Sequence, residues 1–201
     1  MPNTDSTARI PPLEPPYSAE IDEALKRWMP PGSTLEPLAL FRTLMVHDRL
    51  SGRMRAVGAG ILGPSSLVEP RLREVVIHRT CALTGAHYEW GVHASAFARP
   101  LGFSDAQLRS TAYGKAEDSC WDEDQACVFR LAEELHQTST ISEELWQRLS
   151  AHFHDAEVLE LMVTAGWYHV IAYICNGAGV QAEPWATPFP DRGEPGVIPP
   201  P

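Results

Sequence analysis

The sequence RLREVVIHRTCALTGAHYEWGVH, residues 71–93, decides the fold. Pro70 precedes it at the position that proline favours at a helix start, and Gly85 lies just past the point where that helix would end. The stretch therefore predicts a helix over 69–84, a short turn, and a second helix over 86–102. Two helices joined by so short a connection normally pack antiparallel.

Glutamate and histidine occur four residues apart in both predicted helices, as Glu74 and His78 in the first and as Glu89 and His93 in the second. This spacing places each pair on one helix face, and antiparallel packing turns Glu74 toward Glu89 and His93. A carboxylate and an imidazole in a partly apolar pocket are suited to proton transfer, because burial and pairing move their pKa values toward neutrality. We therefore predict Glu74, Glu89 and His93 as catalytic residues.

Two other interpretations of these residues stay open at the level of sequence. A Glu–His pair is common on exposed helices, where it contributes only ~0.3 kcal/mol, although Tyr88 and Trp90 are unusual neighbours for a solvated face. Two glutamates and two histidines on paired helices also fit a metal site, but carboxylate-bridged bundles use Glu-x-x-His and further carboxylates. We expect neither a metal nor another cofactor.

The remaining sequence also has a helical pattern. Sustained alternation of apolar and polar residues, the signature of a strand, is absent. Residues 155–180 are apolar on nearly every side, which predicts a buried central helix. Further helices are predicted over 17–29, 36–50, 51–63, 121–137 and 142–153, and capping-box spacings occur at Ser104–Gln107 and Thr140–Glu143. The fold class is therefore all-α, with eight or nine helices.

Proline-rich segments flank the helical pattern. Residues 1–16 hold five prolines and residues 182–201 hold seven, so neither segment can be a helix. Trp185 and Phe189 indicate that the second segment lies on a protein surface. The expected organisation is an N-terminal arm over 1–16, one helical domain over 17–181, and a C-terminal tail over 182–201.

Charge and composition exclude several classes of partner. The 201 residues include 16 basic and 26 acidic side chains, for a formal charge of −10. Nucleic acids and anionic membranes both require a basic surface, which this sequence lacks. No uninterrupted apolar run reaches the ~18 residues of a membrane span, and the N-terminus does not have the pattern of a signal peptide. We expect a cytoplasmic protein that binds neither nucleic acid nor membranes.

The four cysteines, at positions 81, 120, 127 and 175, form no C-x-x-C and match no zinc-ligand spacing. We expect four reduced thiols, none of them catalytic.

Polar residues on the last predicted helix are most often satisfied core groups. The functional alternative is that they line a pocket, and the predicted substrate-binding residues are accordingly His78, Tyr88, Trp90, His169 and Tyr173.

Two segments of the chain resemble the carboxymuconolactone decarboxylase family, which also includes the alkylhydroperoxidase-D-like (AhpD-like) proteins. They are RLREVVIHRTCALTGAHYEWGVHASAFARPLGFSDAQ, residues 71–107, and GWYHVIAYICNGAGV, residues 166–180. The similarity covers about residues 35–182. It implies an AhpD-like helical bundle and a homo-oligomer, either a trimer or hexamer or else a dimer.

The resemblance also separates the branches of that family. In the peroxidase branch, two cysteines three residues apart precede the histidine, and their positions correspond here to Ala86 and Glu89. Because Cys81 has no nearby cysteine in the sequence, dithiol peroxide reduction is not expected. The decarboxylase branch is expected to have a glutamate four residues before the histidine, as in Glu89 and His93, and it needs no cofactor.

These expectations combine into one functional hypothesis. The chain would be a cofactor-independent acid/base enzyme, a decarboxylase or related lyase or isomerase, whose small-molecule substrate is an unsaturated acid or lactone. His93 would carry the proton, Glu89 would orient it, and Glu74 would be a second carboxylate in the site. The alternatives are a non-catalytic binding or assembly protein on the same fold and an alkylhydroperoxidase-like antioxidant protein.

Overall fold

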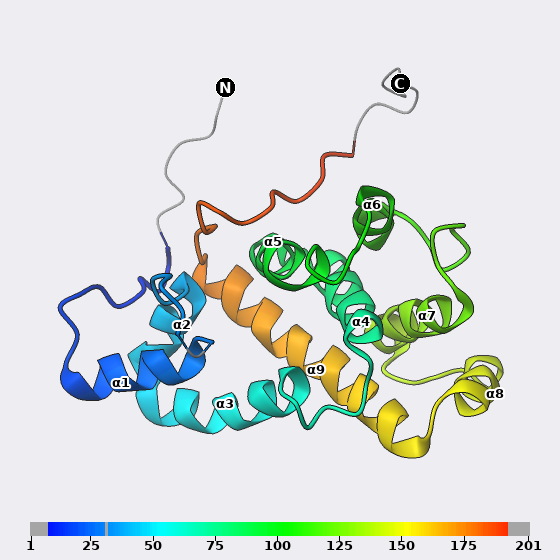
Figure 1. Cartoon of the computed structure of the whole chain (residues 1–201), viewed down its shortest axis with the longest axis horizontal. Coiled ribbons are helices and arrows are strands. Elements are labelled where there is room, and N and C mark those ends of the chain that lie inside the picture. Colours follow the sequence, from blue (N-terminus) through cyan, green and yellow to red (C-terminus); the bar gives the residue numbers. More distant parts are fainter. Residues whose placement is uncertain (1–7, 31, 193–201) are drawn as a thin grey trace.

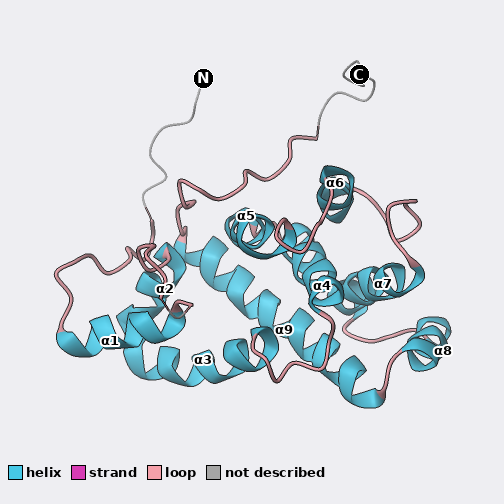
Figure 2. Ribbon diagram, viewed as in Figure 1, coloured by secondary structure: helices cyan, strands magenta, loops and turns pink. Residues whose placement is uncertain are grey.

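The computed structural model describes residues 8–30 and 32–192, and within these residues it contains helices and loops but no strand (Figure 2). The predicted all-α fold class is thus confirmed. The helices are α1 Ala19–Trp28, α2 Ala39–Leu44, α3 Asp48–Leu62, α4 Pro70–Leu83, α5 His87–His93, α6 Asp105–Tyr113, α7 Glu123–Thr138, α8 Glu143–His152 and α9 Asp155–Ala178. A 3-10 turn, Met45–His47, precedes α3, and a π-helical turn, Ala94–Ala98, follows α5.

Helix α9 runs through the middle of the molecule, with α1–α3 on one side and α4–α8 on the other (Figure 1). Helix α4 packs against α5, α6, α7 and α9, so it lies at the centre of the larger side. The buried apolar side chains form two clusters, one around α4 and α7 and a smaller one between α2, α5 and α9. The candidate site lies where α4, α5 and α9 meet.

The turn between α4 and α5 forms as the sequence predicts. At the start of α4, the Glu69 carboxylate accepts hydrogen bonds from the amides of Arg71 and Leu72, at 2.8 and 3.1 Å. At its end, Gly85 has φ of +67°, a conformation that only glycine adopts without cost. The reversal allows α5 to begin two residues later, at His87.

Several predicted helix boundaries are wrong. His47 has a non-helical backbone (φ −127°, ψ 72°), so α3 begins at Asp48 and continues through the boundary predicted between residues 50 and 51. The helix predicted over 86–102 is α-helical only as far as His93 and then widens into the π-helical turn. Ser104 and Gln107 do form a capping box. At α8, however, the cap is Ser142 in place of Thr140, because the Ser142 hydroxyl accepts the Leu145 amide at 3.3 Å.

Helix α9 is central but is not buried on every side. Its inner face packs against α4, α5 and α7, whereas Leu159, Val163, Val170 and Tyr173 are exposed on the outer face. Among the described residues, α9 is the one helix long and apolar enough to cross a bilayer by length and composition. The core helix of a water-soluble protein meets the same criterion, and 44% of the apolar window of α9 is buried within the molecule.

Residues 180–192 pass over α5 toward α6 (Figure 1). The Glu183 carboxylate accepts hydrogen bonds from the Ala39 amide (2.7 Å) and the Tyr88 hydroxyl (2.6 Å). Further along, the Phe189 ring stacks on His87 with 4.0 Å between ring centroids. The parts of the predicted arm and tail at residues 1–7 and 193–201 lie outside the described residues.

Candidate active site

His93 is held between two carboxylates and a phenol, all of them buried. Its Nδ1 lies 2.9 Å from Oε2 of Glu74, on α4. Its Nε2 lies 2.9 Å from the hydroxyl of Tyr168, on α9, and 3.4 Å from Oε1 of Glu89, one turn earlier on α5. Glu74, Glu89, His93 and Tyr168 are each less than 8% exposed. The three predicted catalytic residues therefore do meet, and we call these four residues the His93 relay.

The two glutamates contact different nitrogens of the His93 ring. Glu74 makes the shorter contact and binds Nδ1, which fixes the orientation of the ring. Glu89 lies beside Nε2, the nitrogen that also contacts Tyr168. Glu74 is therefore the carboxylate that holds Nδ1 of the ring, and Glu89 lies beside the other nitrogen.

The charge of His93 follows from its neighbours. Burial by itself would lower the pKa of the imidazole, but the carboxylates of Glu74 and Glu89 outweigh it and raise the pKa from 6.5 to about 9. His93 is thus an imidazolium at neutral pH. A buried imidazolium with one N–H fixed by Glu74 can donate its other proton, so the resting state is that of a general acid.

His78 has the opposite character. Its Nδ1 donates to the Glu74 carbonyl oxygen at 2.8 Å, and its ring lies against Trp90 and Phe103. Complete burial lowers the pKa of His78 to about 4, although the nearby Glu74 carboxylate partly offsets that effect. His78 is therefore neutral at pH 7. Its Nδ1–H supports the backbone of α4, and its ring forms part of the apolar wall behind Glu74.

Three buried acceptor atoms in this region have no hydrogen-bond partner among the described residues: Oε1 of Glu74, Oε2 of Glu89 and Nε2 of His78. An unsatisfied buried polar atom is costly, and such atoms are rare outside functional sites. Each of the three accepts hydrogen bonds, so the region is suited to a molecule that donates them. The residues that the structure describes contain no group of three or more His, Cys, Asp or Glu side chains arranged to hold a metal ion.

Tyr168 was not among the predicted site residues. His169 and Tyr173 are the residues predicted on that helix, because all three lie in one apolar helix whose inward face is not evident from apolar periodicity. Consecutive helical residues point about 100° apart. The direct contact of Tyr168 with His93 thus places His169 on another face of α9.

The predicted substrate-binding residues divide into two groups. Trp90 is buried beside His78, and the Tyr88 hydroxyl donates to Glu183, so both pack near the relay without contacting His93. The structure does not bring His169 and Tyr173 to the site. His169 accepts a hydrogen bond from His136 at 3.0 Å on the surface, and Tyr173 is 68% exposed.

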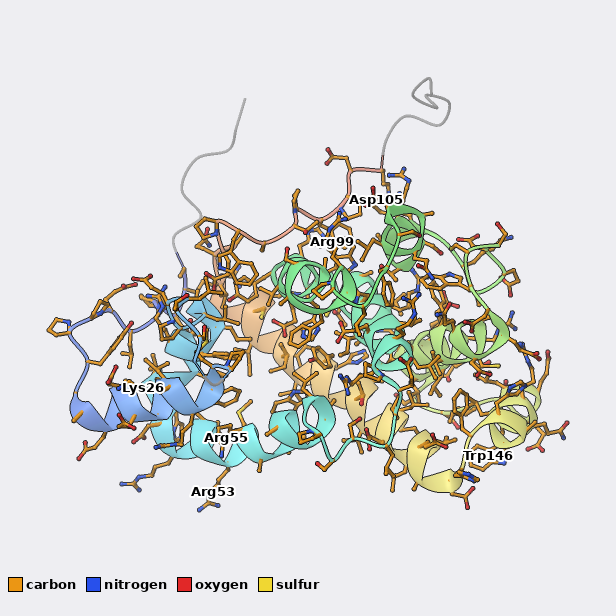
Figure 3. All side chains as sticks on the ribbon, viewed as in Figure 1. Lys26, Arg53, Arg55, Arg99, Asp105 and Trp146 are labelled. Carbon is orange, nitrogen blue, oxygen red and sulfur yellow. The ribbon has the colours of Figure 1, made fainter. Side chains whose placement is uncertain are left out.

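A groove of about 260 Å³ lies on the other side of Trp90 from the relay, between α6 and the C-terminal segment. Arg99 and Asp105, which form an ion pair of 3.1 Å, lie at its edge (Figure 3). Thr187 and Pro188 line the opposite side. No residue of the His93 relay lines this groove, so the chemistry suggested by the buried charges is not located there.

The cysteines near the relay are protonated. Burial raises the pKa of Cys81 well above its usual value, and Glu89 and Cys175 raise it further. Burial and Glu89 likewise raise the pKa of Cys175. Because a thiolate is the reactive form of cysteine, neither thiol is prepared for attack on a peroxide or a halogenated substrate.

Comparisons with known proteins support the fold. No protein-family model and no curated protein matches the sequence. Among solved structures, an uncharacterized peroxidase-related protein from Silicibacter sp. TM1040 shares 12% identity, with a TM-score of 0.77 over 90% of this chain and 96% of the other. The chain has the AhpD-like fold.

Two further solved structures with the AhpD-like fold are similar to this chain at low sequence identity. A candidate antioxidant defence protein AhpD from Agrobacterium tumefaciens shares 17% identity, with a TM-score of 0.63 over 70% of this chain and 94% of the other. A debrominase, Bmp8, in complex with 2,3,4-tribromopyrrole shares 10% identity, with a TM-score of 0.74 over 90% of this chain and 95% of the other. The resemblance seen in the sequence is thus confirmed for the fold, and one AhpD-like scaffold accommodates different chemistries.

The two histidines predict that the protein is most stable near pH 6.5. The pKa of His93 is raised to about 9, so its contribution is complete below pH 6.5 and is lost as the pH rises through 9. The pKa of His78 is lowered to about 4, so its contribution is complete above pH 6.5 and is lost as the pH falls through 4. Each group changes the free energy of unfolding by roughly 3 kcal/mol. Urea denaturation between pH 4 and 9.5 measures both effects, and a flat alkaline side would contradict the assignment of His93.

Proposed function

We propose that the protein is a cofactor-independent acid/base enzyme that acts on a small unsaturated acid or lactone as a decarboxylase, or as a related lyase or isomerase. The observation that carries the proposal is the buried His93 imidazolium, which Glu74 orients through Nδ1 while Glu89 and Tyr168 lie at Nε2. This arrangement supplies a positioned acid and a nearby carboxylate without a thiol or a metal ligand set.

In a decarboxylation, the bond between the substrate carbon and its carboxylate breaks and CO2 leaves. The electron pair remains on the substrate as an enolate-type carbanion, and Nε2–H of His93 then protonates the carbon. Glu74 keeps the ring in place and stabilises its charge. Glu89 and Tyr168, on the same side of the ring, are positioned to return a proton to Nε2 from water. In an isomerisation the same groups would remove a proton from one carbon and return it to another.

The antioxidant alternative is less well supported. The positions of the two redox cysteines hold Ala86 and Glu89, and the thiols of Cys81 and Cys175 have raised pKa values. Dithiol reduction of a peroxide requires a reactive thiolate and a second cysteine that resolves the resulting intermediate. In this chain the Glu89 carboxylate stands at the position where the second redox cysteine would be.

The proposal is tested by incubating the protein in D2O with a panel of unsaturated carboxylic acids and lactones and following the products by proton NMR. Decarboxylation is expected to release CO2 and to place one deuterium on the carbon that carried the carboxylate. An isomerase would place deuterium at the new C–H position. A protein that binds panel members without turnover or deuterium incorporation would instead support the binding-protein alternative.

Activity is expected to be independent of cysteine. The double variant Cys81→Ala/Cys175→Ala should retain at least half of the wild-type turnover, because both thiols are protonated and neither contacts the proton that His93 transfers. The measurement is the same NMR assay on protein shown to be folded by circular dichroism. Loss of turnover in the folded double variant, together with hydroperoxide reduction by the wild type, would replace the acid/base proposal with a redox function.

A further inference from the structure

The outer face of α9 carries a continuous apolar seam that no other described residue covers. Its residues follow one another at alternating intervals of four and three, as Leu159, Val163, Gly166, Val170, Tyr173 and Gly177. All six are exposed, Leu159 by 59% and Tyr173 by 68%. Intervals of four and three are the spacing by which one helix packs lengthwise along another. The seam extends for ~27 Å at 1.5 Å per residue.

No contact among the described residues explains the two glycines of the seam. Each costs about 1 kcal/mol relative to alanine in a helix. A Cβ placed on Gly166 or Gly177 would meet no atom within 4 Å, so no internal contact requires a glycine there. Glycine on an exposed helix face allows another backbone or a large side chain to approach closely. The expected occupant therefore lies outside the described residues of this chain.

From the size pattern of the seam, we propose that α9 packs antiparallel against α9 of a second copy of this chain. In the antiparallel register, Leu159 faces Gly177 of the second copy, Val163 faces Tyr173, and Gly166 faces Val170. Each glycine then lies opposite an aliphatic side chain, Leu159 or Val170, and the remaining pair joins Val163 and Tyr173. The seam is complementary to itself, as an interface with two-fold symmetry requires.

Charge also favours a copy of the same chain. The protein carries a formal charge of −10, so most pairs of surfaces on two copies would repel. Between residues 161 and 178, however, α9 contains no Asp, Glu, Lys or Arg. Glu160, at the edge of the seam, points toward its own chain, where its carboxylate accepts a hydrogen bond from the Leu67 amide at 3.0 Å. The seam is thus a neutral strip on an acidic protein.

The area needed for a stable dimer extends beyond the seam. A strip ~27 Å long and ~10 Å wide covers roughly 270 Å² per copy, whereas stable interfaces bury about 600–1,000 Å² per partner. Helix α3 can supply the remainder, because it packs against α9, where a Cβ added to Gly58 would contact the Trp167 ring at 3.6 Å, and because it exposes Leu50 and Val57. The proposed interface is therefore the α9 seam flanked by α3.

A lipid bilayer fits this face less well than a second copy does. A membrane-spanning helix would need apolar residues on all faces, but the inner face of α9 is committed to the core of the molecule. A helix lying on a membrane surface normally has Lys and Arg along its polar edge, and the seam has none along residues 161–178. The proposal does not depend on the proposed catalytic function, since no residue of the His93 relay lies in the seam.

Sedimentation velocity tests the interface directly. The wild type at 5–100 µM is expected to be a dimer of twice 22.2 kDa, about 44 kDa, or an even multiple of it. Val170→Glu places two like charges near the symmetry axis and should halve the mass, whereas the control Leu35→Glu, at an exposed leucine in the loop between α1 and α2, should leave it unchanged. A monomeric wild type, or an oligomer that Val170→Glu does not alter, would overturn the proposal.

Cross-linking tests the register. In the double variant Val163→Cys/Tyr173→Cys, oxidation should link two copies, because the two positions face each other across the antiparallel seam. The single variant Val163→Cys should not link, since each Val163 would face a tyrosine. Linking by the single variant would indicate a parallel pair and would overturn the register. A monomer that floats with phosphatidylcholine vesicles, and loses this binding in Val170→Glu, would assign the seam to lipid instead.

Discussion

Turnover is expected to fall by ~10²–10⁴ when His93 is replaced by glutamine, the usual contribution of a positioned general acid. Glutamine is of similar size and can still bond to Glu74, but it has no proton to give at neutral pH. The rate is measured in the deuterium-incorporation assay and divided by the folded fraction, because the substitution also leaves Glu74 without its ionic partner. Glu89→Gln should lower the rate to a similar extent, since it removes the carboxylate beside Nε2.

The relay hypothesis also predicts how the substitutions of Glu89 and His93 combine in a double variant. If Glu89 and His93 act as one unit, the double variant should be scarcely slower than either single variant, because residues of one relay are not additive. His169→Gln is the matched control, as it removes another histidine, on α9, that is hydrogen-bonded to His136 away from the site. A His93→Gln protein with the wild-type rate, or a His169→Gln protein as slow as His93→Gln, would refute the assignment.

Much of this site could be predicted from local spacing. The Glu–His intervals in α4 and α5, the short connection at Gly85 and antiparallel packing together place Glu74 against His93, and the structure gives 2.9 Å between them. These are short-range relations within one helical hairpin. They depend on helix geometry and on a single turn, both of which the sequence encodes strongly.

The third side of the site could not be predicted in the same way. Tyr168 comes from α9, 75 residues after His93, and the sequence of α9 is apolar almost all round, so its inward face is not evident from periodicity. The same uniform hydrophobicity concealed the exposed seam of α9. Helix spacing favours the Glu89–His93 contact within α5, whereas the shorter contact to His93 is made across the hairpin by Glu74.

The charge states of the two histidines likewise depend on tertiary structure. Each lies four residues after a glutamate, and both are buried, yet the pKa of His93 is raised and that of His78 is lowered. Burial by itself lowers both pKa values. His93 is hydrogen-bonded to the Glu74 carboxylate at 2.9 Å and also lies near Glu89, which together outweigh its burial, whereas His78 Nδ1 bonds to the Glu74 carbonyl and lies farther, at 3.5 Å, from its carboxylate. Only the packing of α4 against α5 distinguishes the two.

Glu74→Gln is expected to lower the free energy of unfolding at pH 7 by about 3–5 kcal/mol, the cost of breaking a buried ion pair by removing one partner. Glu74 and His93 are almost completely buried, so water cannot replace the lost interaction. Urea denaturation followed by circular dichroism measures the change. The control is Glu23→Gln, which breaks the solvent-exposed ion pair of Glu23 with Lys26 and should leave the free energy of unfolding nearly unchanged.

The combination with His93→Gln separates an ion pair from simple loss of packing. In the double variant Glu74→Gln/His93→Gln no charge of the Glu74–His93 pair remains buried, so its destabilisation should be smaller than the sum of the two single effects by about 1–3 kcal/mol. The loss of stability between pH 6.5 and 9 should also disappear in both variants that lack His93, since the group with the raised pKa is gone. Strict additivity, or a Glu74→Gln protein within about 1 kcal/mol of the wild type, would mean that His93 is neutral in the folded protein, and the general acid would then have to be sought elsewhere in the site.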